Sequence, residues 1–157
     1  MFKINKAQAH CDIPCKVYDP AVIQYSCLSL VRFMDLINDE IKDSDMNAAK
    51  IAPLARLTAV KEEHAKEVKN EIATIWGDYF KEPQISKHPE IHDLTHSIMQ
   101  MASKCKQDID RSHGVELLKK VNKFTEIFWE TKNVKTQKCF APYPPELVIV
   151  CPILKSA

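Results

Sequence analysis

Apolar residues recur every three or four positions in four stretches of the chain, with charged and polar residues between them. This spacing places the apolar side chains on one face of an α-helix. Asp19 and Pro20 precede the first stretch as an acidic N-cap and a proline at the first helical position. We therefore expect a first helix from Pro20 to about Lys42. Its apolar face is formed by Ile23, Cys27, Leu30, Met34, Ile37 and Ile41.

Three further helices follow from the same pattern. The second is expected to start near Pro53 and to stop before Pro83, the third opens at Pro89-Glu90, and Ser112 caps the fourth. Four narrow apolar faces can bury one common core. The sequence therefore predicts an all-α fold, an antiparallel up-down four-helix bundle. The three faces carry Leu57, Val60, His64, Val68, Ile72, Ile75 and Tyr79, then Ile91, Leu94, Ile98, Met101 and Cys105, then Leu117, Val121, Phe124 and Phe128.

The pattern changes from Asn133 onward. The run A-P-Y-P-P is typical of extended or turn structure, and Leu147-Val148-Ile149-Val150 has strand propensity. We interpret residues 133–157 as an irregular C-terminal extension, an apolar tail that covers part of the bundle. An oligomer contact is the alternative.

Composition narrows the range of functions. The chain has 157 residues, enough for one domain, and its net charge of +1 comes from interspersed acids and bases. No dense basic face is available for nucleic acid. No apolar run approaches the roughly 20 residues that span a bilayer, and the first nine residues lack the apolar core of a secretory signal. We expect a cytoplasmic protein with no nucleic-acid and no membrane partner.

The six cysteines fall into three groups. Cys27 and Cys105 lie on apolar helical faces and are expected to be small buried core residues. The two cysteines of the tail, at positions 139 and 151, receive no role. Cys11 and Cys15 differ from the others because they lie in a polar, proline-containing segment that has no core to fill.

That segment reads H-C-D-I-P-C-K-V-Y-D-P from His10. Two thiolates four residues apart can reach one metal ion, although C-x-x-x-C alone also fits a redox pair, half of a zinc site or no site. Cleavage after Ala9, in the small-residue run Ala7-Gln8-Ala9, would free the His10 amine as a further donor. Two nitrogens and two sulfurs in a plane, with an axial imidazole, suit Ni(II) or Cu(II) better than zinc.

The segment resembles the nickel hook of the nickel-dependent superoxide dismutase family, whose usual form is H-C-D-x-P-C-G-V-Y-D-P. Only the glycine differs, and it is Lys16 here. The stretches I-W-G-D-Y-F-K, K-H-P-E-I-H and I-F-W-E-T-K also resemble the family, so the resemblance covers about Ala9 to Lys132. It implies a leader of residues 1–9 removed by a maturation protease, and a domain of residues 10–132. This domain would hold the hook at 10–20 and the bundle at 20–132.

The resemblance also implies the assembly, the metal and the reaction. The family forms homohexamers with one nickel ion per subunit and converts superoxide into dioxygen and hydrogen peroxide. By this resemblance His10 gives its amine and imidazole to nickel, Cys11 its backbone nitrogen and thiolate, and Cys15 its thiolate.

Further site residues follow from the resemblance. Tyr18 and Tyr79 would order water or substrate near the open face of the metal. Asp12, together with Pro14, would shape the loop. Lys81 is expected to attract the superoxide anion electrostatically, as is Lys16.

The sequence departs from the family at two further positions. The family usually has glutamate at the position of Ser26 and arginine at that of His64, a pair that orients the axial imidazole. We therefore expect axial coordination to be altered or tuned in this chain. His64 would either contact the hook imidazole or be a hydrogen-bonded core histidine.

Two other functions compete with the enzyme. The first is a nickel or copper carrier that uses the same donors without turnover. The second is a structural helical oligomer with a redox-labile cysteine pair. Nickel-dependent superoxide consumption that vanishes in Cys11→Ser distinguishes the enzyme from both.

Overall fold

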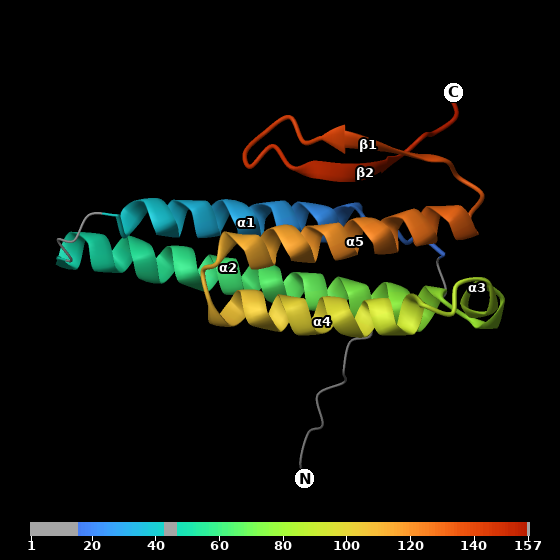
Figure 1. The fold of residues 1–157 in the computed structure, drawn as a ribbon, viewed down its shortest axis with the longest axis horizontal. Helices are drawn as coiled ribbons and strands as arrows, with labels where there is room; N and C mark the ends of the chain where they lie inside the picture. Colours follow the sequence, from blue (N-terminus) through green and yellow to red (C-terminus); the bar gives the residue numbers. More distant parts are fainter. Residues whose placement is uncertain (1–15, 43–46, 157) are drawn as a thin grey trace, which may run out of the picture.

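Four long helices form the body of the molecule in the computed structural model, which describes residues 16–42 and 47–156. They are α1 (Ala21–Glu40), α2 (Ala48–Thr74), α4 (Ile91–Gln107) and α5 (Arg111–Thr131). Helix α1 packs against α2 and α5, and α4 packs against the same two helices. Consecutive long helices run in opposite directions (Figure 1). The predicted antiparallel four-helix bundle is therefore confirmed.

The link between α2 and α4 contains structure that the hydrophobic pattern did not predict. Helix α2 continues into a π-helical turn, η1 (Ile75–Tyr79), and a short helix, α3 (Glu82–Lys87), follows it. Pro83 lies in the first turn of α3, where a missing backbone N–H costs nothing. Figure 1 shows α3 at the end of the bundle where the chain enters α1.

Two predicted helix starts were wrong because polar side chains upstream supply better caps. Helix α2 begins at Ala48, and the side chain of Asn47 accepts hydrogen bonds from the backbone of Ala49 and Lys50. Pro53 lies inside α2, where its side chain is exposed. In α5 the cap is Asp110, whose carboxylate accepts from the backbone N–H of Ser112, so Ser112 is not the cap.

The bundle core is continuous and mostly aliphatic and aromatic. Cys27 and Cys105 are fully buried, as predicted. The apolar face of α2 differs from the prediction in its first half, because Lys61 and Ala65 are buried there while Val60 and His64 are partly exposed. Within residues 16–42 and 47–156, no helix has the length and apolar character needed to cross a lipid bilayer.

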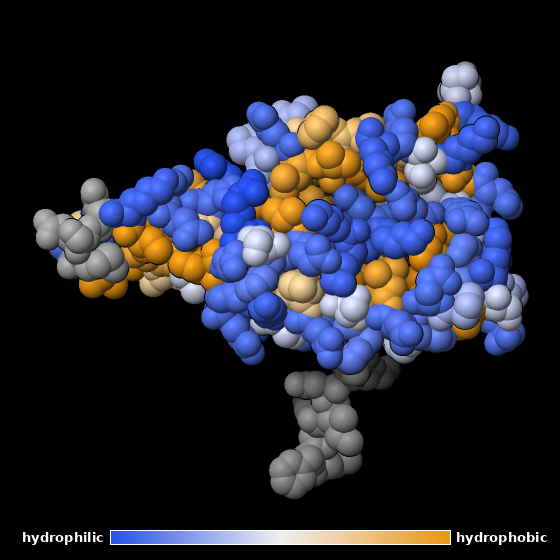
Figure 2. Space-filling view, in the orientation of Figure 1, coloured by the Kyte–Doolittle hydropathy of each residue, from blue (hydrophilic) through white to orange (hydrophobic). Residues whose placement is uncertain are grey.

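The C-terminal tail is a β-hairpin and not an irregular segment. Strands β1 (Thr136–Phe140) and β2 (Val148–Pro152) pair antiparallel, and the hairpin lies over α1 and α5 (Figure 1). On the face shown in Figure 2, hydrophobic residues gather at the loop end of the hairpin, while hydrophilic residues cover much of the bundle. The tail covers part of the bundle, as predicted.

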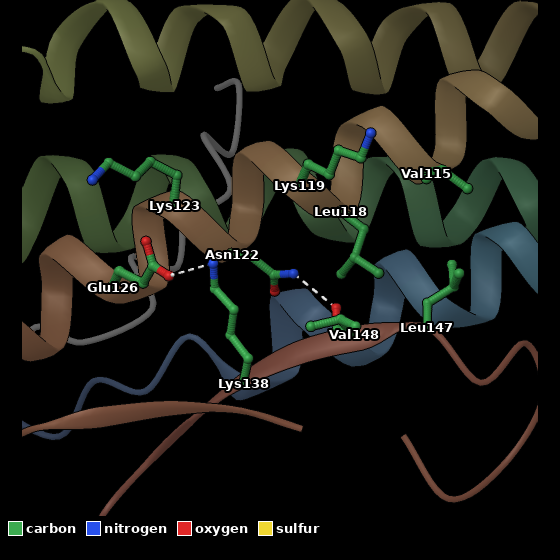
Figure 3. Close-up of a pocket in the computed structure, with 9 residues that line it drawn as sticks. All are labelled: Val115, Leu118, Lys119, Asn122, Lys123, Glu126, Lys138, Leu147 and Val148. Carbon is green, nitrogen blue, oxygen red and sulfur yellow. Dashed lines mark hydrogen bonds and ion pairs between the residues drawn. The ribbon is translucent and has the colours of Figure 1, made fainter. Parts of the chain in front are cut away.

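Side chains from the bundle satisfy the outer edge of β2. Gln24 of α1 donates to the carbonyl of Val150 at 3.0 Å and accepts from its N–H at 2.7 Å. Asn122 of α5 donates to the carbonyl of Val148 at 2.8 Å (Figure 3). A buried strand edge needs such partners, because unpaired backbone groups away from water are costly. The hairpin is therefore part of the folded unit.

A pocket of about 440 Å³ remains between α5 and the hairpin. Its apolar wall includes Leu118 and Val148, and an ion pair joins Lys138 to Glu126 at 3.6 Å (Figure 3).

Candidate metal centre

The predicted site residues divide into two groups. His10, Cys11, Asp12 and Cys15 lie outside the described residues, whereas Tyr18, Tyr79 and Lys81 lie inside them. In the part of the chain that the structure describes, no three His, Cys, Asp or Glu side chains gather into a possible metal site. The structure therefore describes the part of the predicted site that Tyr18, Tyr79 and Lys81 contribute.

Two tyrosines that are far apart in the sequence meet at the end of the bundle. Tyr18 lies just before α1, and Tyr79 is the last residue of η1. Their ring centroids are 6.0 Å apart, and the rings are tilted by 53°. Tyr79 also packs on Phe128 at 4.8 Å and on Phe80 at 5.2 Å. The structure therefore brings together the two tyrosines that the resemblance assigned to one site.

The π-helical turn sets the position of Tyr79. The N–H of Phe80 donates to the carbonyl of Ile75 at 3.4 Å. The two residues are five positions apart, which is the hydrogen-bond pattern of a π-turn. Phe80 and Ile75 are buried, and Tyr79 between them is only partly exposed. Such turns are frequent at functional sites because they rotate a side chain out of the regular helical position.

Lys81 is attached to this same turn. Its ammonium donates to the carbonyl of Gly77 at 2.6 Å, and its side chain is exposed. Among the described residues, no atom lies within 4 Å of where a Cβ on Gly77 would be. Lys81 therefore brings a solvent-exposed positive charge to the turn that carries Tyr79.

A hydrogen-bond chain determines where the proton of Tyr79 points. The phenol oxygen lies 2.6 Å from the hydroxyl oxygen of Thr131, and that hydroxyl donates to the carbonyl of Phe128 at 2.6 Å. Threonine has a single O–H to donate. Since Thr131 uses it on Phe128, Tyr79 is the donor to Thr131, and the phenol oxygen retains lone pairs as an acceptor.

Lys132 is a site residue that sequence reasoning missed. Its ammonium lies 4.6 Å from the centroid of the Tyr79 ring and 5.1 Å from that of Phe128, which are cation–π distances. The available signal was its place as the last residue of the I-F-W-E-T-K stretch. The tyrosine pair therefore has a second nearby cation in addition to Lys81.

Lys16, which follows Cys15 inside the hook, has an unusual backbone. Lys16 has a φ of 60°, in the left-handed region that glycine adopts without strain. This is the position where the hook motif usually has glycine. The backbone shape that suits glycine is therefore present here, with a lysine carrying it.

Ser26 and His64, the two departures from the family pattern, are joined by a third residue. One carboxylate oxygen of Glu67 accepts from the Ser26 hydroxyl at 2.7 Å and lies 3.2 Å from Nδ1 of His64. The His64 ring also stacks on Phe33 at 5.7 Å. His64 is partly exposed and is not a core residue.

Glu67 therefore places a carboxylate between Ser26 and His64, the two positions that differ from the family pattern. Sequence reasoning missed Glu67, and the only signal was its place three residues after His64 on the same helix.

Comparisons with known proteins give the same family over most of the chain. The family model of nickel-containing superoxide dismutase matches residues 5–132. The superoxide dismutase [Ni] of Streptomyces seoulensis is 34% identical over 128 residues, which cover 82% of this chain and 92% of that protein. The enzyme of Streptomyces coelicolor is 33% identical over 125 residues, 80% of this chain and 89% of that protein.

Solved structures agree with the fold. A native nickel superoxide dismutase superposes with a TM-score of 0.68 at 32% identity, covering 78% of this chain and 99% of that one. A nickel-containing superoxide dismutase with nickel ligation of the oxidised state gives 0.70 at 31% identity, covering 79% and 99%. With its bundle, its paired tyrosines and the match over residues 5–132, the chain belongs to the nickel-containing superoxide dismutase family and is a nickel-dependent superoxide dismutase.

Proposed function

We propose that His10, Cys11 and Cys15 hold the nickel ion of this superoxide dismutase, and that Asp12, Tyr18, Tyr79 and Lys81 complete its site. The observation that carries the proposal is the contact between Tyr18 and Tyr79. Tyr18 follows Cys15 by three residues, a length of chain that spans at most about 11 Å. A metal site that includes Cys15 therefore forms within reach of the tyrosine pair.

The donor set suits nickel. Thiolates and a deprotonated amide are anionic donors that stabilise the higher oxidation state of the metal and bring its potential into range. Nickel supplies one-electron cycling, by which two superoxide ions and two protons become dioxygen and hydrogen peroxide. The protein must then supply access for an anion and protons for the product.

Tyr79 is suited to holding a proton carrier. Because its O–H is donated to Thr131, its phenol oxygen can accept a hydrogen bond from a water molecule on the exposed side. Packing on Phe80 and Phe128 prevents the ring from turning away. Tyr18 forms the other wall, so a water or a superoxide ion between the hook and the tyrosines is oriented by both.

Positive charge around the tyrosines favours the anionic substrate. Three lysines lie on the segments that carry or contact the tyrosine pair: Lys81, Lys132 and the exposed Lys16. The protein as a whole carries a charge of only +1. Local fields of this kind raise the association rate of an anion and weaken as salt is added.

Glu67 supplies the carboxylate that the family pattern places on α1. Ser26 lies in the second turn of α1, six residues after the last residue of the hook, Pro20, and it fixes Glu67 through the 2.7 Å hydrogen bond. We propose that the Glu67–His64 pair orients the imidazole of His10, so that axial coordination is tuned from α2.

Maturation and assembly complete the proposal. Removal of residues 1–9 by a protease would free the His10 amine, and the mature chains would assemble as homohexamers in the cytoplasm. Membership of the nickel-containing superoxide dismutase family supports the leader and the hexamer as proposals.

Reconstitution of the mature chain tests the metal site. Protein that begins at His10 is expected to bind one Ni(II) per chain, to show sulfur-to-metal charge-transfer absorption and to consume superoxide. Cys11→Ser is expected to lose the absorption and at least about a hundredfold of the activity, because one thiolate donor is gone. Cys139→Ser, which lies outside the bundle, is the matched control and should retain both. Full charge-transfer absorption in Cys11→Ser would refute the assignment.

Glu67→Gln tests the positioning role, with Glu63→Gln, an exposed acid on the same helix, as control. We expect Glu67→Gln to change the axial-nitrogen splitting in the electron paramagnetic resonance spectrum of the oxidised nickel protein and to lower kcat/KM about tenfold. Glu63→Gln should change neither. Identical spectra for the two variants would remove Glu67 from the site.

A further inference from the structure

The hairpin places two thiols on one of its faces. Cys139 of β1 pairs with Ile149, and Cys151 of β2 pairs with Gln137. The two cysteines are therefore diagonal neighbours, one cross-strand pair apart, and their side chains project from the same face of the hairpin. Both side chains are partly exposed.

The two thiols also interact. Burial raises the pKa of Cys151, and a hydrogen bond and a charge interaction with Cys139 raise it further. Cys151 therefore keeps its proton longer than an isolated thiol, and its S–H is shared with the neighbouring sulfur. The hydrogen bond therefore holds the two sulfurs next to each other.

A second pair of cysteines in the same chain provides a contrast. Cys27 and Cys105 are fully buried in the bundle. Burial raises the pKa of Cys105 to about 12 and holds that of Cys27 well above its usual range. Thiols in such surroundings are inert because the thiolate is the reactive form.

We propose that Cys139 and Cys151 form a peroxide-reactive dithiol that closes to a disulfide across the hairpin. The Cys139 thiolate attacks one oxygen of hydrogen peroxide, which forms a sulfenic acid and releases the other oxygen as water after protonation. The Cys151 sulfur then attacks the sulfenic sulfur, and a second water leaves. The dithiol loses two electrons and two protons, and one peroxide becomes two waters.

Hydrogen peroxide is the product of the dismutase reaction, so the enzyme generates the oxidant in its own surroundings. This part of the inference rests on the enzyme activity. The reaction with added peroxide does not, since neither cysteine belongs to the proposed nickel site.

The pairing register of β1 and β2 indicates that a disulfide between Cys139 and Cys151 would be reversible. Diagonal neighbours in an antiparallel pair have Cα atoms about 7–8 Å apart, just beyond the distance that a disulfide spans without movement of the backbone. The bond would therefore be strained, and strained, partly exposed disulfides are the ones that thiols reduce readily.

Peptide mass measurement on the full chain tests the proposal. Trypsin cuts after Lys138 and Lys155 and nowhere between them, so one peptide carries Cys139 and Cys151 and no other cysteine. Fully reduced protein is treated with hydrogen peroxide, alkylated and digested. We expect this peptide to lose about 2 Da and both alkylation sites. Dithiothreitol should restore both sites.

Cys27, in the tryptic peptide of residues 17–32, is the internal control and should stay fully alkylated. In Cys151→Ser the sulfenic acid of Cys139 has no partner, and dimedone is expected to label it. The hook cysteines fall in a different peptide, so failure of the nickel site would leave this measurement unaffected. The proposal is wrong if the 139–155 peptide stays doubly alkylated, if it gains oxygen without forming a disulfide, or if Cys27 oxidises equally fast.

Discussion

Lys61 is a fully buried cation in the middle of the bundle, with an exposed fraction of 1%. Its ammonium donates to the backbone carbonyls of Cys105 at 2.8 Å, Lys106 at 3.0 Å and Asp108 at 2.5 Å. These carbonyls lie at the C-terminal end of α4, where intrahelical donors run out. Burial lowers the pKa of Lys61, which shows that the charge is costly to hold there. The three hydrogen bonds offset that cost and join α2 to α4.

We expect Lys61→Met to lower the free energy of unfolding by about 1–3 kcal/mol, because the carbonyls at the end of α4 lose their donor. Urea denaturation followed by circular dichroism measures the change. Lys66→Met, an exposed lysine on the same helix, is the control and should change stability by less than about 0.5 kcal/mol. Equal stability of the two variants would show that water replaces the ammonium at these carbonyls.

Helix caps link sequence to stability at the scale of single elements. Asp110 closes the first turn of α5 by accepting from the N–H of Ser112 at 2.8 Å. Hydrogen bonding to Ser112 holds the pKa of Asp110 below its ordinary value of 3.8. The ionised form is therefore favoured in the folded state. Its stabilisation is present above pH 3.8 and is lost as the pH falls through the lower, folded value.

The lowered pKa of Asp110 predicts how two variants at this position behave. At neutral pH, Asp110→Ala is expected to lower Tm more than Asp110→Asn, since asparagine still caps the helix. The difference in Tm between the wild type and Asp110→Asn should shrink as the pH falls below about 4, where the wild-type carboxylate becomes protonated. Thermal melts at several pH values measure it. A constant difference at all pH values would exclude the carboxylate charge as the cause.

The whole molecule consists of the bundle and the hairpin joined by polar and apolar contacts. Gln24 and Asn122 satisfy the edge of β2, and Ala141, Ile149 and Val150 of the hairpin are buried. Gln24 belongs to α1 and Asn122 belongs to α5. The hairpin therefore covers apolar surface of the bundle that would otherwise face water.

Truncation after Lys132 is expected to lower the free energy of unfolding by roughly 2–4 kcal/mol, as two large aliphatic side chains lose their buried contacts. Truncation after Pro152 removes residues 153–157, of which the described ones, 153–156, are all exposed, and is the matched control. Chemical denaturation of the three proteins measures the difference. If the protein truncated after Lys132 is as stable as the full chain, the hairpin does not contribute to the stability of the bundle.

Local patterns predicted much of the fold because helix formation depends on neighbours three and four residues away. The apolar faces of α1, α4 and α5 and the burial of Cys27 and Cys105 follow from such spacing, but Ile41, predicted on the face of α1, lies beyond the end of that helix and is exposed. The prediction for α2 was wrong at Lys61 and His64, because Lys61 is buried through partners on α4 that are more than 40 residues away. Strand β1 was missed because its pairing with β2 depends on register and not on its own composition.

For the metal site, the order of residues along one short segment was sufficient to propose the donors, and the family to which the segment belongs gives nickel as the metal. The proposed imidazole and thiolates, and the amine that cleavage after Ala9 would free, belong to six consecutive residues, and such a donor set follows from covalent order. The surroundings of that segment depended on tertiary structure. The contact of Tyr18 with Tyr79, Lys132 over the Tyr79 ring, and Glu67 between Ser26 and His64 join residues from different helices. Such contacts exist only when the packed bundle brings distant segments together, so no local pattern could predict them.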